Sequence, residues 1–355
     1  MPGVPEPTRT MSTSPARIHV VSDPLFEAHR SRGYHPERPE RLGAARRGVE
    51  QAGVEALALD ARDASDQDLE RAHDPRYLAE LAGIAGHYAA LDADTYLAPQ
   101  SVAAARRAAG GTIALVDALL ADSSVTSGVA LLRPPGHHAT RDQGMGFCLL
   151  NNASVGALWA LAHGLSRVAI VDWDVHHGNG TQNIHWTDPR VLYVSLHEAP
   201  LYPGSGAREE VGQGDGAGFT LNVPLSEGAT DAVYGLAFEE LILPVLGKFA
   251  PELVLISAGF DAHERDPLAL MRLTAPGYAY MGAALSRVAA ASGKGRVGIV
   301  LEGGYDLTAI EVSLAAAIQG VTSGDAPAIS GEASAAHRQE VAAAKAVAER
   351  WWPGI

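Results

Sequence analysis

The strongest constraint on the fold is a set of short apolar runs in which polar residues do not alternate. Three clear examples are Val168–Val171, Leu253–Ser257 and Val297–Leu301. Strands of this kind are buried on both faces, as in a parallel sheet that helices cover on each side. Longer stretches with helical periodicity separate the runs. The alternation predicts an α/β domain with a central, mainly parallel sheet and helices on both faces.

The expected strands are Arg17–Ser22, Gly128–Leu132, Val168–Val171, Val191–Leu196, Phe219–Val223, Leu253–Ser257 and Val297–Leu301. The expected helices are Arg41–Gln51, Pro99–Ala121, Ala153–Gly164, Ala232–Phe249, Pro276–Ala291 and Ala335–Arg350. No repeat and no heptad pattern interrupts this order.

The composition excludes several classes of protein. Of the 355 residues, 47% are apolar and 19% are charged, which is typical of a globular protein and rules out extensive disorder. The net charge of −14 disfavours nucleic acid as a partner and suits small or cationic substrates. The single cysteine, Cys148, excludes an intramolecular disulfide and a cysteine-clustered zinc site.

We expect three segments: a flexible leader at 1–16, one catalytic domain at 17–322, and a C-terminal helix and tail at 323–355. The leader contains no apolar stretch typical of a secretion signal. Residues 143–166 carry no charged side chain, but the polar Asn151, Asn152 and His163 predict a buried loop and helix instead of a membrane span. We therefore expect a cytoplasmic protein without a membrane partner, and the arginine-rich, lysine-poor sequence indicates a bacterial source. Assembly into a homo-oligomer is left open.

Two tryptophans near the end of the chain, Trp351 and Trp352, follow the last expected helix. We expect them to dock on the body of the domain. A contact with a partner is the alternative.

Polar residues of catalytic type follow the expected strands. His137 and His138 follow the second strand, Asp172 and Asp174 follow the third, and other strand ends carry Asp261 and Tyr305. Ligands of open α/β sheets bind outside the carboxyl ends of the strands. These residues are therefore expected to meet at one rim.

Three of these residues form a candidate metal site. Asp174 and His176 are two positions apart, so on an extended segment their side chains point the same way. Asp261 would join them from a neighbouring strand end. Two carboxylates and one imidazole leave a coordination position open, as in catalytic zinc sites, although Fe²⁺, Co²⁺ or Mn²⁺ also suit this set. Aspartates that cap helices are the structural alternative. A histidine pair beside the metal can supply a general base and a general acid.

Seven motifs occur in register along the chain: RPPGHHA (133–139), GFCLLNN (146–152), DWDVHHGNGTQ (172–182), YVSLH (193–197), SAGFDAH (257–263), DPL (266–268) and EGGYDL (302–307). Together they resemble the zinc-dependent histone deacetylase family, which has an arginase-like α/β fold. The resemblance extends from about residue 18 to 320. The DWDVHHGNGTQ string is most similar to the class II branch and its bacterial deacetylase-like and acetylpolyamine amidohydrolase relatives.

The resemblance implies a role for several residues of these motifs. It makes Asp174, His176 and Asp261 the zinc ligands, and His137 and His138 the tandem catalytic histidines. Asp172 would orient the first histidine, while Asn179 stands behind the second where other branches carry an aspartate. Tyr305 would donate a hydrogen bond to the substrate carbonyl oxygen. A structural potassium ion is also implied, with the matching positions Asp172, Asp174, His176, Ser195 and Leu196.

The resemblance also implies a narrow tunnel for the acyl group. Gly146 and Phe147 would line one wall, and Tyr202 replaces the phenylalanine that is usual on the other wall. Leu268 occupies the position that guards the tunnel mouth, and Asp94 matches an aspartate at the rim that grips the substrate backbone.

These observations predict a metal-dependent amidohydrolase that removes acetyl groups from N-acetylated amines, with acetyl-lysine-type substrates favoured. A deacetylase of acetylpolyamines or other small amines is the first alternative. An inactive module that binds acylated ligands is the second, and it is disfavoured because Tyr305 and the metal trio are all present.

Overall fold

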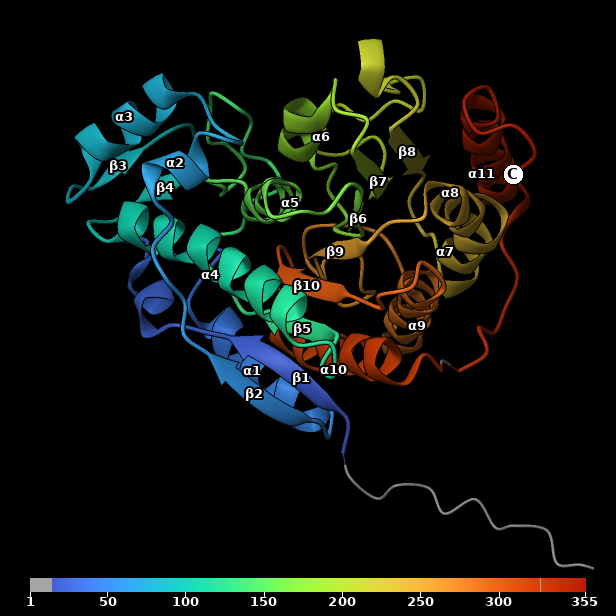
Figure 1. The fold of residues 1–355 in the computed structure, drawn as a ribbon, viewed down its shortest axis with the longest axis horizontal. Coiled ribbons are helices and arrows are strands. Elements are labelled where there is room, and N and C mark those ends of the chain that lie inside the picture. Colours follow the sequence, from blue (N-terminus) through green and yellow to red (C-terminus); the bar gives the residue numbers. More distant parts are fainter. Residues whose placement is uncertain (1–14, 326) are drawn as a thin grey trace, which may run out of the picture.

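The computed structural model describes residues 15–325 and 327–355, so most of the predicted leader at 1–16 lies outside the described residues. Its centre is an eight-stranded sheet with the order β2-β1-β5-β10-β9-β6-β7-β8, and every pair of neighbours is parallel (Figure 1). The strands are β1 (Arg17–Val21), β2 (Glu55–Leu59), β5 (Ser127–Ala130), β6 (Val168–Asp172), β7 (Val191–Glu198), β8 (Thr220–Leu225), β9 (Leu253–Ala258) and β10 (Val297–Leu301). The predicted α/β fold with a parallel sheet is confirmed.

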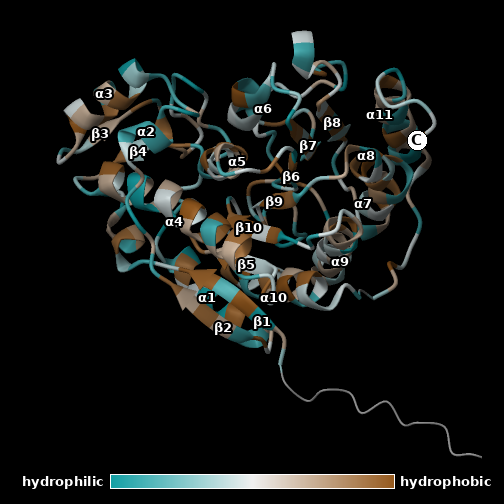
Figure 2. Ribbon diagram, viewed as in Figure 1, coloured by the Kyte–Doolittle hydropathy of each residue, from teal (hydrophilic) through white to brown (hydrophobic). Residues whose placement is uncertain are grey.

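The strands in the middle of the sheet are completely buried. Every residue of β6, β7, β9 and β10 is buried. Figure 2 shows these strands mostly in the brown of apolar residues. Burial on both faces explains why their sequences are continuous apolar runs.

Helices cover the two faces of the sheet. On one face, α4 (Ser101–Ala121) and α5 (Asn152–Ala162) pack against each other and against the strands. On the other face, α1 (Glu40–Gln51), α9 (Ala275–Ala291) and α10 (Leu307–Ser323) form a second layer (Figure 1). The α4 layer approaches closely enough that a Cβ at Gly128 would lie 2.2 Å from Leu115 Cδ1, which explains the glycine in β5.

The structure adds elements that the sequence analysis did not predict. Strand β2 lies at the sheet edge, and none of its residues is buried. Its sequence, EALAL, contains none of the β-branched residues that occur in the central strands. Helix α10 is also new.

The helix expected at 232–249 is interrupted: α7 (Asp231–Ala237) and α8 (Leu243–Phe249) flank a π-helical turn at Phe238–Ile242. Pro244 has no N–H to donate to the preceding turn, which accounts for the break.

A smaller layer surrounds a second apolar cluster. It contains α2 (Asp66–Leu69), α3 (Pro75–Ile84) and the short strands β3 (Ala89–Ala90) and β4 (Tyr96–Leu97). This layer carries the rim segment that includes Asp94.

The remaining short elements lie elsewhere. Helix α6 (Asn179–His185) begins inside the DWDVHHGNGTQ motif, and short 3-10 turns occupy Pro24–Ala28 and Gly214–Gly216.

The C-terminal helix α11 (Ala335–Ala348) packs against β8. Trp352 Nε1 donates to Gly218 O at 2.8 Å, and its ring contacts Phe219, so this tryptophan docks on the body. Helix α10 ends at Ser323, one residue beyond the predicted domain boundary at 322, which stays a prediction.

Within residues 15–325 and 327–355, no helix is both long enough and apolar enough to cross a membrane. The uncharged stretch 143–166 forms a loop followed by α5, most of which is buried.

Candidate metal centre and catalytic pocket

The catalytic-type residues meet because four neighbouring strands end at the same edge. Asp172 is the last residue of β6, and the loop behind it carries Asp174 and His176. Asp261 follows β9, and Tyr305 follows β10. The strand order β5-β10-β9-β6 places these ends next to one another, and the histidine pair follows β5. The sequence prediction that they share one rim therefore matches the structure.

Asp174, His176 and Asp261 form a compact group whose potential ligand atoms all lie within 4.8 Å of one another. His176 Nδ1 lies 3.2 Å from Asp174 Oδ1 and 3.1 Å from Asp261 Oδ2. The two aspartates are fully buried. Backbone N–H groups fix both carboxylates, because Gly303 donates to Asp174 Oδ2 at 2.8 Å and Val175 donates to Asp261 Oδ1 at 2.9 Å.

The donor set fits a divalent cation. Two buried carboxylates side by side repel each other unless a positive charge lies between them. Two glycines keep this space open: a Cβ at Gly259 would lie 2.1 Å from Asp174 Oδ2, and a Cβ at Gly303 would lie 2.3 Å from Asp261 Oδ2. The chemistry of one imidazole and two carboxylates suits zinc and the other metals named above.

The adjacent histidines have different partners. His137 Nδ1 lies 3.1 Å from Asp172 Oδ2, and that same oxygen accepts from the Tyr193 hydroxyl at 3.1 Å. His138 Nδ1 lies 2.8 Å from the amide oxygen of Asn179. Because both partners accept, each histidine carries its proton on Nδ1 and turns Nε2 toward the site. Burial and the neighbouring His137 hold the pKa of His138 well below its ordinary value.

Tyr305 follows β10 and lines the same pocket as His138 and His176. Its backbone N–H donates to Asp266 Oδ2 at 2.6 Å, which fixes the start of the turn. Burial, and then the charge of Asp261, raise the pKa of the Tyr305 hydroxyl well above its ordinary value. The hydroxyl therefore stays protonated and available as a hydrogen-bond donor at neutral pH. Asp266 is a residue whose positioning role the sequence analysis missed.

A pocket of about 220 Å³ opens over these groups. All five residues expected to bind substrate line it, and His138, His176 and Tyr305 reach its inner surface. His137 does not line it and lies behind His138, with ring centroids 4.0 Å apart. The expected lining residues are Asp94, Gly146, Phe147, Tyr202 and Leu268.

The residues expected to hold potassium lie on β6, on β7 and in the loop after β6. Asp172 and Ser195 are register partners in the sheet, and Leu196 follows in β7. Ser195 Oγ lies 2.9 Å from His197 Nδ1.

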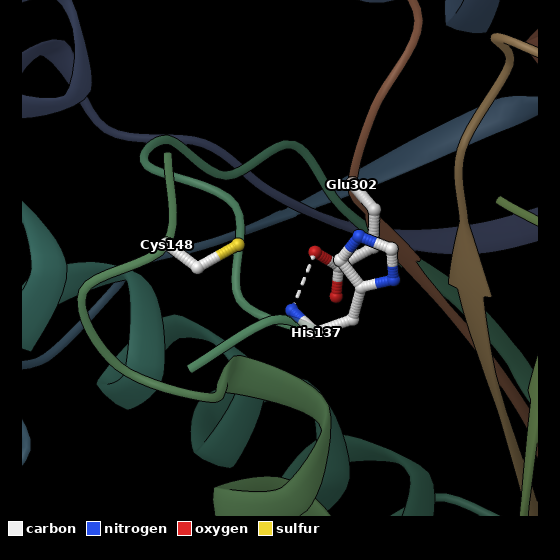
Figure 3. A group of neighbouring side chains, drawn as sticks. All are labelled: His137, Cys148 and Glu302. Carbon is white, nitrogen blue, oxygen red and sulfur yellow. Dashed lines mark hydrogen bonds between the residues drawn. The ribbon is translucent and has the colours of Figure 1, made fainter. Parts of the chain in front are cut away.

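A second group of ligand-type residues, His137, Cys148 and Glu302, also comes within 4.8 Å (Figure 3). Glu302 Oε2 accepts from the backbone N–H groups of Gly136 and His137, at 2.6 and 3.1 Å. Figure 3 shows the second of these bonds joining the carboxylate to the histidine loop. Burial raises the pKa of the Cys148 thiol well above its ordinary value, so it is a packed thiol. This group holds a loop in place.

A network of buried ion pairs lies behind the loop that carries Tyr305. Arg133 donates to Glu37 Oε2 at 2.6 Å and Arg41 donates to Glu37 Oε1 at 3.0 Å, and all three side chains are fully buried. Arg41 also donates to Gly304 O at 2.6 Å, beside Tyr305. Arg41 lies at the start of α1, where a surface position would be expected, but its side chain is fully buried. Glu37 was missed because its partner Arg133 is distant in the sequence.

A parallel sheet whose carboxyl edge brings together a candidate metal-ligand trio, a histidine pair and a tyrosine has the arrangement typical of hydrolases that use a metal. Comparison with known proteins identifies the family. Residues 35–321 match the model of the histone deacetylase domain. The chain belongs to the histone deacetylase family.

The chain is 43% identical to histone deacetylase 15 of Arabidopsis thaliana over 293 residues, which are 80% of this chain and 52% of that protein. It is 41% identical to the human polyamine deacetylase HDAC10 over 316 residues, which are 83% of this chain and 46% of that protein. The chain thus spans about half the length of these two relatives. The crystal structure of the HDA15 HD domain superimposes with a TM-score of 0.87 at 38% identity, covering 96% of this chain and 97% of that one.

Proposed function

We propose that the protein is a metal-dependent amidohydrolase that removes acetyl groups from N-acetylated amines. The observation that carries this proposal is the 220 Å³ pocket, which His176 of the candidate metal trio, His138 and Tyr305 line together. Amide hydrolysis needs an activated water, a hydrogen-bond donor for the carbonyl oxygen and a proton for the leaving amine. Each requirement has a residue at this pocket.

Asp174, His176 and Asp261 would hold the metal, with Zn²⁺ as the first choice and Fe²⁺ or Co²⁺ as alternatives. When bound, a metal of this kind lowers the pKa of a coordinated water and polarises the substrate carbonyl. A structural potassium ion at Asp172, Asp174, His176, Ser195 and Leu196 belongs to the same proposal.

His138 would act as the general base and then the general acid. Its Nδ1–H is held by Asn179, so Nε2 can take a proton from water and return it to the leaving amine. His137 would stay behind it, oriented by Asp172. Tyr305 would donate to the carbonyl oxygen as negative charge develops there.

The pocket walls favour an aliphatic substrate stem. Phe147 and Tyr202 line the pocket, and Leu268 stands at its mouth. An apolar gate suits the methylene chain of acetyl-lysine, which is the substrate class we propose. Acetylpolyamines remain the alternative, favoured by the net charge of −14 and by the name of the human relative HDAC10, a polyamine deacetylase.

The central test measures hydrolysis of a fluorogenic acetyl-lysine peptide by the metal-loaded protein. We expect activity that chelation abolishes and Zn²⁺ restores. Asp261→Asn should lower the metal content, because it removes an anionic ligand. An unchanged metal content in this variant would overturn the assignment of the ligands, and absence of hydrolysis by the loaded protein would overturn the function.

A second measurement decides between the two substrate classes. We expect a higher kcat/KM for acetyl-lysine peptides than for acetylspermidine or acetylputrescine. Leu268→Glu should shift the ratio toward polyamines, because it places a counter-charge at the mouth. A wild-type protein that already prefers acetylpolyamine about tenfold would contradict the argument from the gate.

A further inference from the structure

The 220 Å³ pocket described above is called the acyl pocket from here on. A second pocket adjoins it and has no part in the chemistry proposed above. Its volume is about 400 Å³. Its walls come from three loops at the carboxyl edge of the sheet, namely 198–201 after β7, 226–227 after β8 and 267–270 after β9. Leu201 and Leu268 line both this pocket and the acyl pocket. The two pockets are therefore neighbours that share these two side chains.

The charge of this side pocket has a single sign. Among the residues that line it, only Glu198 and Glu227 are ionisable, and both are carboxylates. The other lining residues are mostly apolar, including Pro200, Pro267 and Leu270. The side pocket thus combines an apolar wall with two acidic groups, which is the pattern suited to an aliphatic chain that ends in a cation.

Glu198 is built into the side pocket, because only 6% of the residue is exposed. Its Oε2 accepts from the backbone N–H of Leu270 at 2.8 Å, which fixes the side chain across the gap between two of the loops. Its Oε1 accepts no hydrogen bond from any described residue and no cationic side chain pairs with it. The side chain as a whole is nearly buried, but this oxygen is open to solvent and can be reached by a ligand. A carboxylate in such a partly dry setting gains free energy from a donor that carries positive charge.

We propose that the side pocket is a subsite for a second, cationic group of the substrate, held by Glu198 with Glu227 at its rim. The proposal rests on the proposed amidohydrolase function and names a further feature of its substrate. The acetylated amine enters the acyl pocket, its stem passes Leu268, and an ammonium or guanidinium group on the same molecule reaches Glu198. The exposed Leu270, 61% of which is accessible, covers the aliphatic part of that arm.

The same chemistry occurs in two kinds of molecule. One is a peptide with arginine or lysine beside the acetyl-lysine, and the other is a small acetylated polyamine. The experiment includes both. The first arm compares an acetyl-lysine peptide carrying a neighbouring arginine with the same peptide carrying citrulline, which has nearly the same shape but no charge. The second arm compares N-acetylputrescine with N-butylacetamide, which lacks the ammonium group.

We expect the metal-loaded protein to favour the charged member of at least one pair by about fivefold or more in kcat/KM and in binding affinity. Higher salt should reduce this preference, because it screens a partly exposed ion pair. Glu198→Gln keeps an acceptor for Leu270 and removes the charge, so it should bring the ratio close to one. Glu227→Gln, at an exposed position, should reduce the ratio less. The pair that shows the preference identifies the source of the cation.

The matched control is Glu80→Gln on α3, which makes the same charge change outside both pockets and should leave the ratio unchanged. Binding is measured by competition as well as by turnover, so the two proposals can fail separately. Equal affinities within both pairs would overturn the subsite even if all substrates were hydrolysed. A ratio that survives Glu198→Gln would also overturn it. Absence of hydrolysis of every substrate would overturn the proposed function, while the affinity ratios would still decide the subsite.

Discussion

His137 and His138 show how one position along the chain changes the chemistry of the same side chain. His137 faces the carboxylate of Asp172 and is shielded from the pocket, whereas His138 faces the neutral amide of Asn179 and lines the pocket. A carboxylate stabilises the charged imidazolium, and an amide does so much less. The proposed division of the pair into an electrostatic partner and a proton carrier is based on this difference in partners, which the HH sequence alone does not reveal.

Tyr305→Phe should remove one hydrogen bond and little else. The ring would keep its contacts with Phe147, and the backbone N–H would still bind Asp266. We expect kcat to fall by on the order of 100-fold with KM and metal content nearly unchanged, because the bond forms to charge that develops in the transition state. Steady-state kinetics and metal analysis provide the check. A rise confined to KM would make Tyr305 a binding residue instead.

At the scale of elements, the glycines of the strand-end loops shape the candidate metal site. Asp174 lies between the loop after β9 and the loop after β10, and each loop approaches its carboxylate through a glycine, Gly259 and Gly303. A side chain at either position would occupy the space of a ligand oxygen. The SAGFDAH and EGGYDL motifs therefore specify close backbone approach as much as they specify catalytic side chains.

Gly303→Ala should displace the ligands without changing any of them. The added Cβ would lie 2.3 Å from Asp261 Oδ2 and 2.5 Å from Asp174 Oδ2. We expect weaker metal binding by about tenfold or more and a matching loss of activity, because misplaced ligands cost affinity. Gly83→Ala in α3 is the control, since its Cβ would meet nothing within 4 Å. Metal titration of both variants decides; normal affinity in Gly303→Ala would refute this account.

The same elements show how far the sequence could predict the structure. The central strands β6, β9 and β10 were predicted because burial on both faces imposes continuous apolar residues. Strand β2 escaped prediction because an edge strand is stabilised by its pairing with β1 more than by its composition. The metal trio follows from strand-end placement, but Glu37 and Asp266 act through partners that only the folded chain brings near.

For the molecule as a whole, several buried histidines outside the candidate metal trio are held neutral by burial. Burial lowers the pKa of His73 and of His185 to about 4, and it lowers the pKa of His29 to about 3. His73 shows the structural reason: Nδ1 lies 2.9 Å from Thr140 O, while Nε2 accepts from the Asn151 N–H at 3.0 Å. A second proton on this ring would break the bond to Asn151.

These histidines predict a loss of stability in mild acid. The unfolded chain binds protons on them below about pH 6.5, whereas the folded chain does not until about pH 4. Their full contribution is therefore present above pH 6.5 and is lost as the pH falls. At pH 5 each should lower the free energy of unfolding by roughly 2 kcal/mol. Denaturant unfolding of the chelator-treated protein, which excludes effects of metal release, measures this change.

His73→Gln should weaken the pH dependence, and His163→Gln, at an exposed position, should leave it intact. A pH dependence that is the same in His73→Gln and in the wild type would show that this ring does not stay neutral in the folded protein.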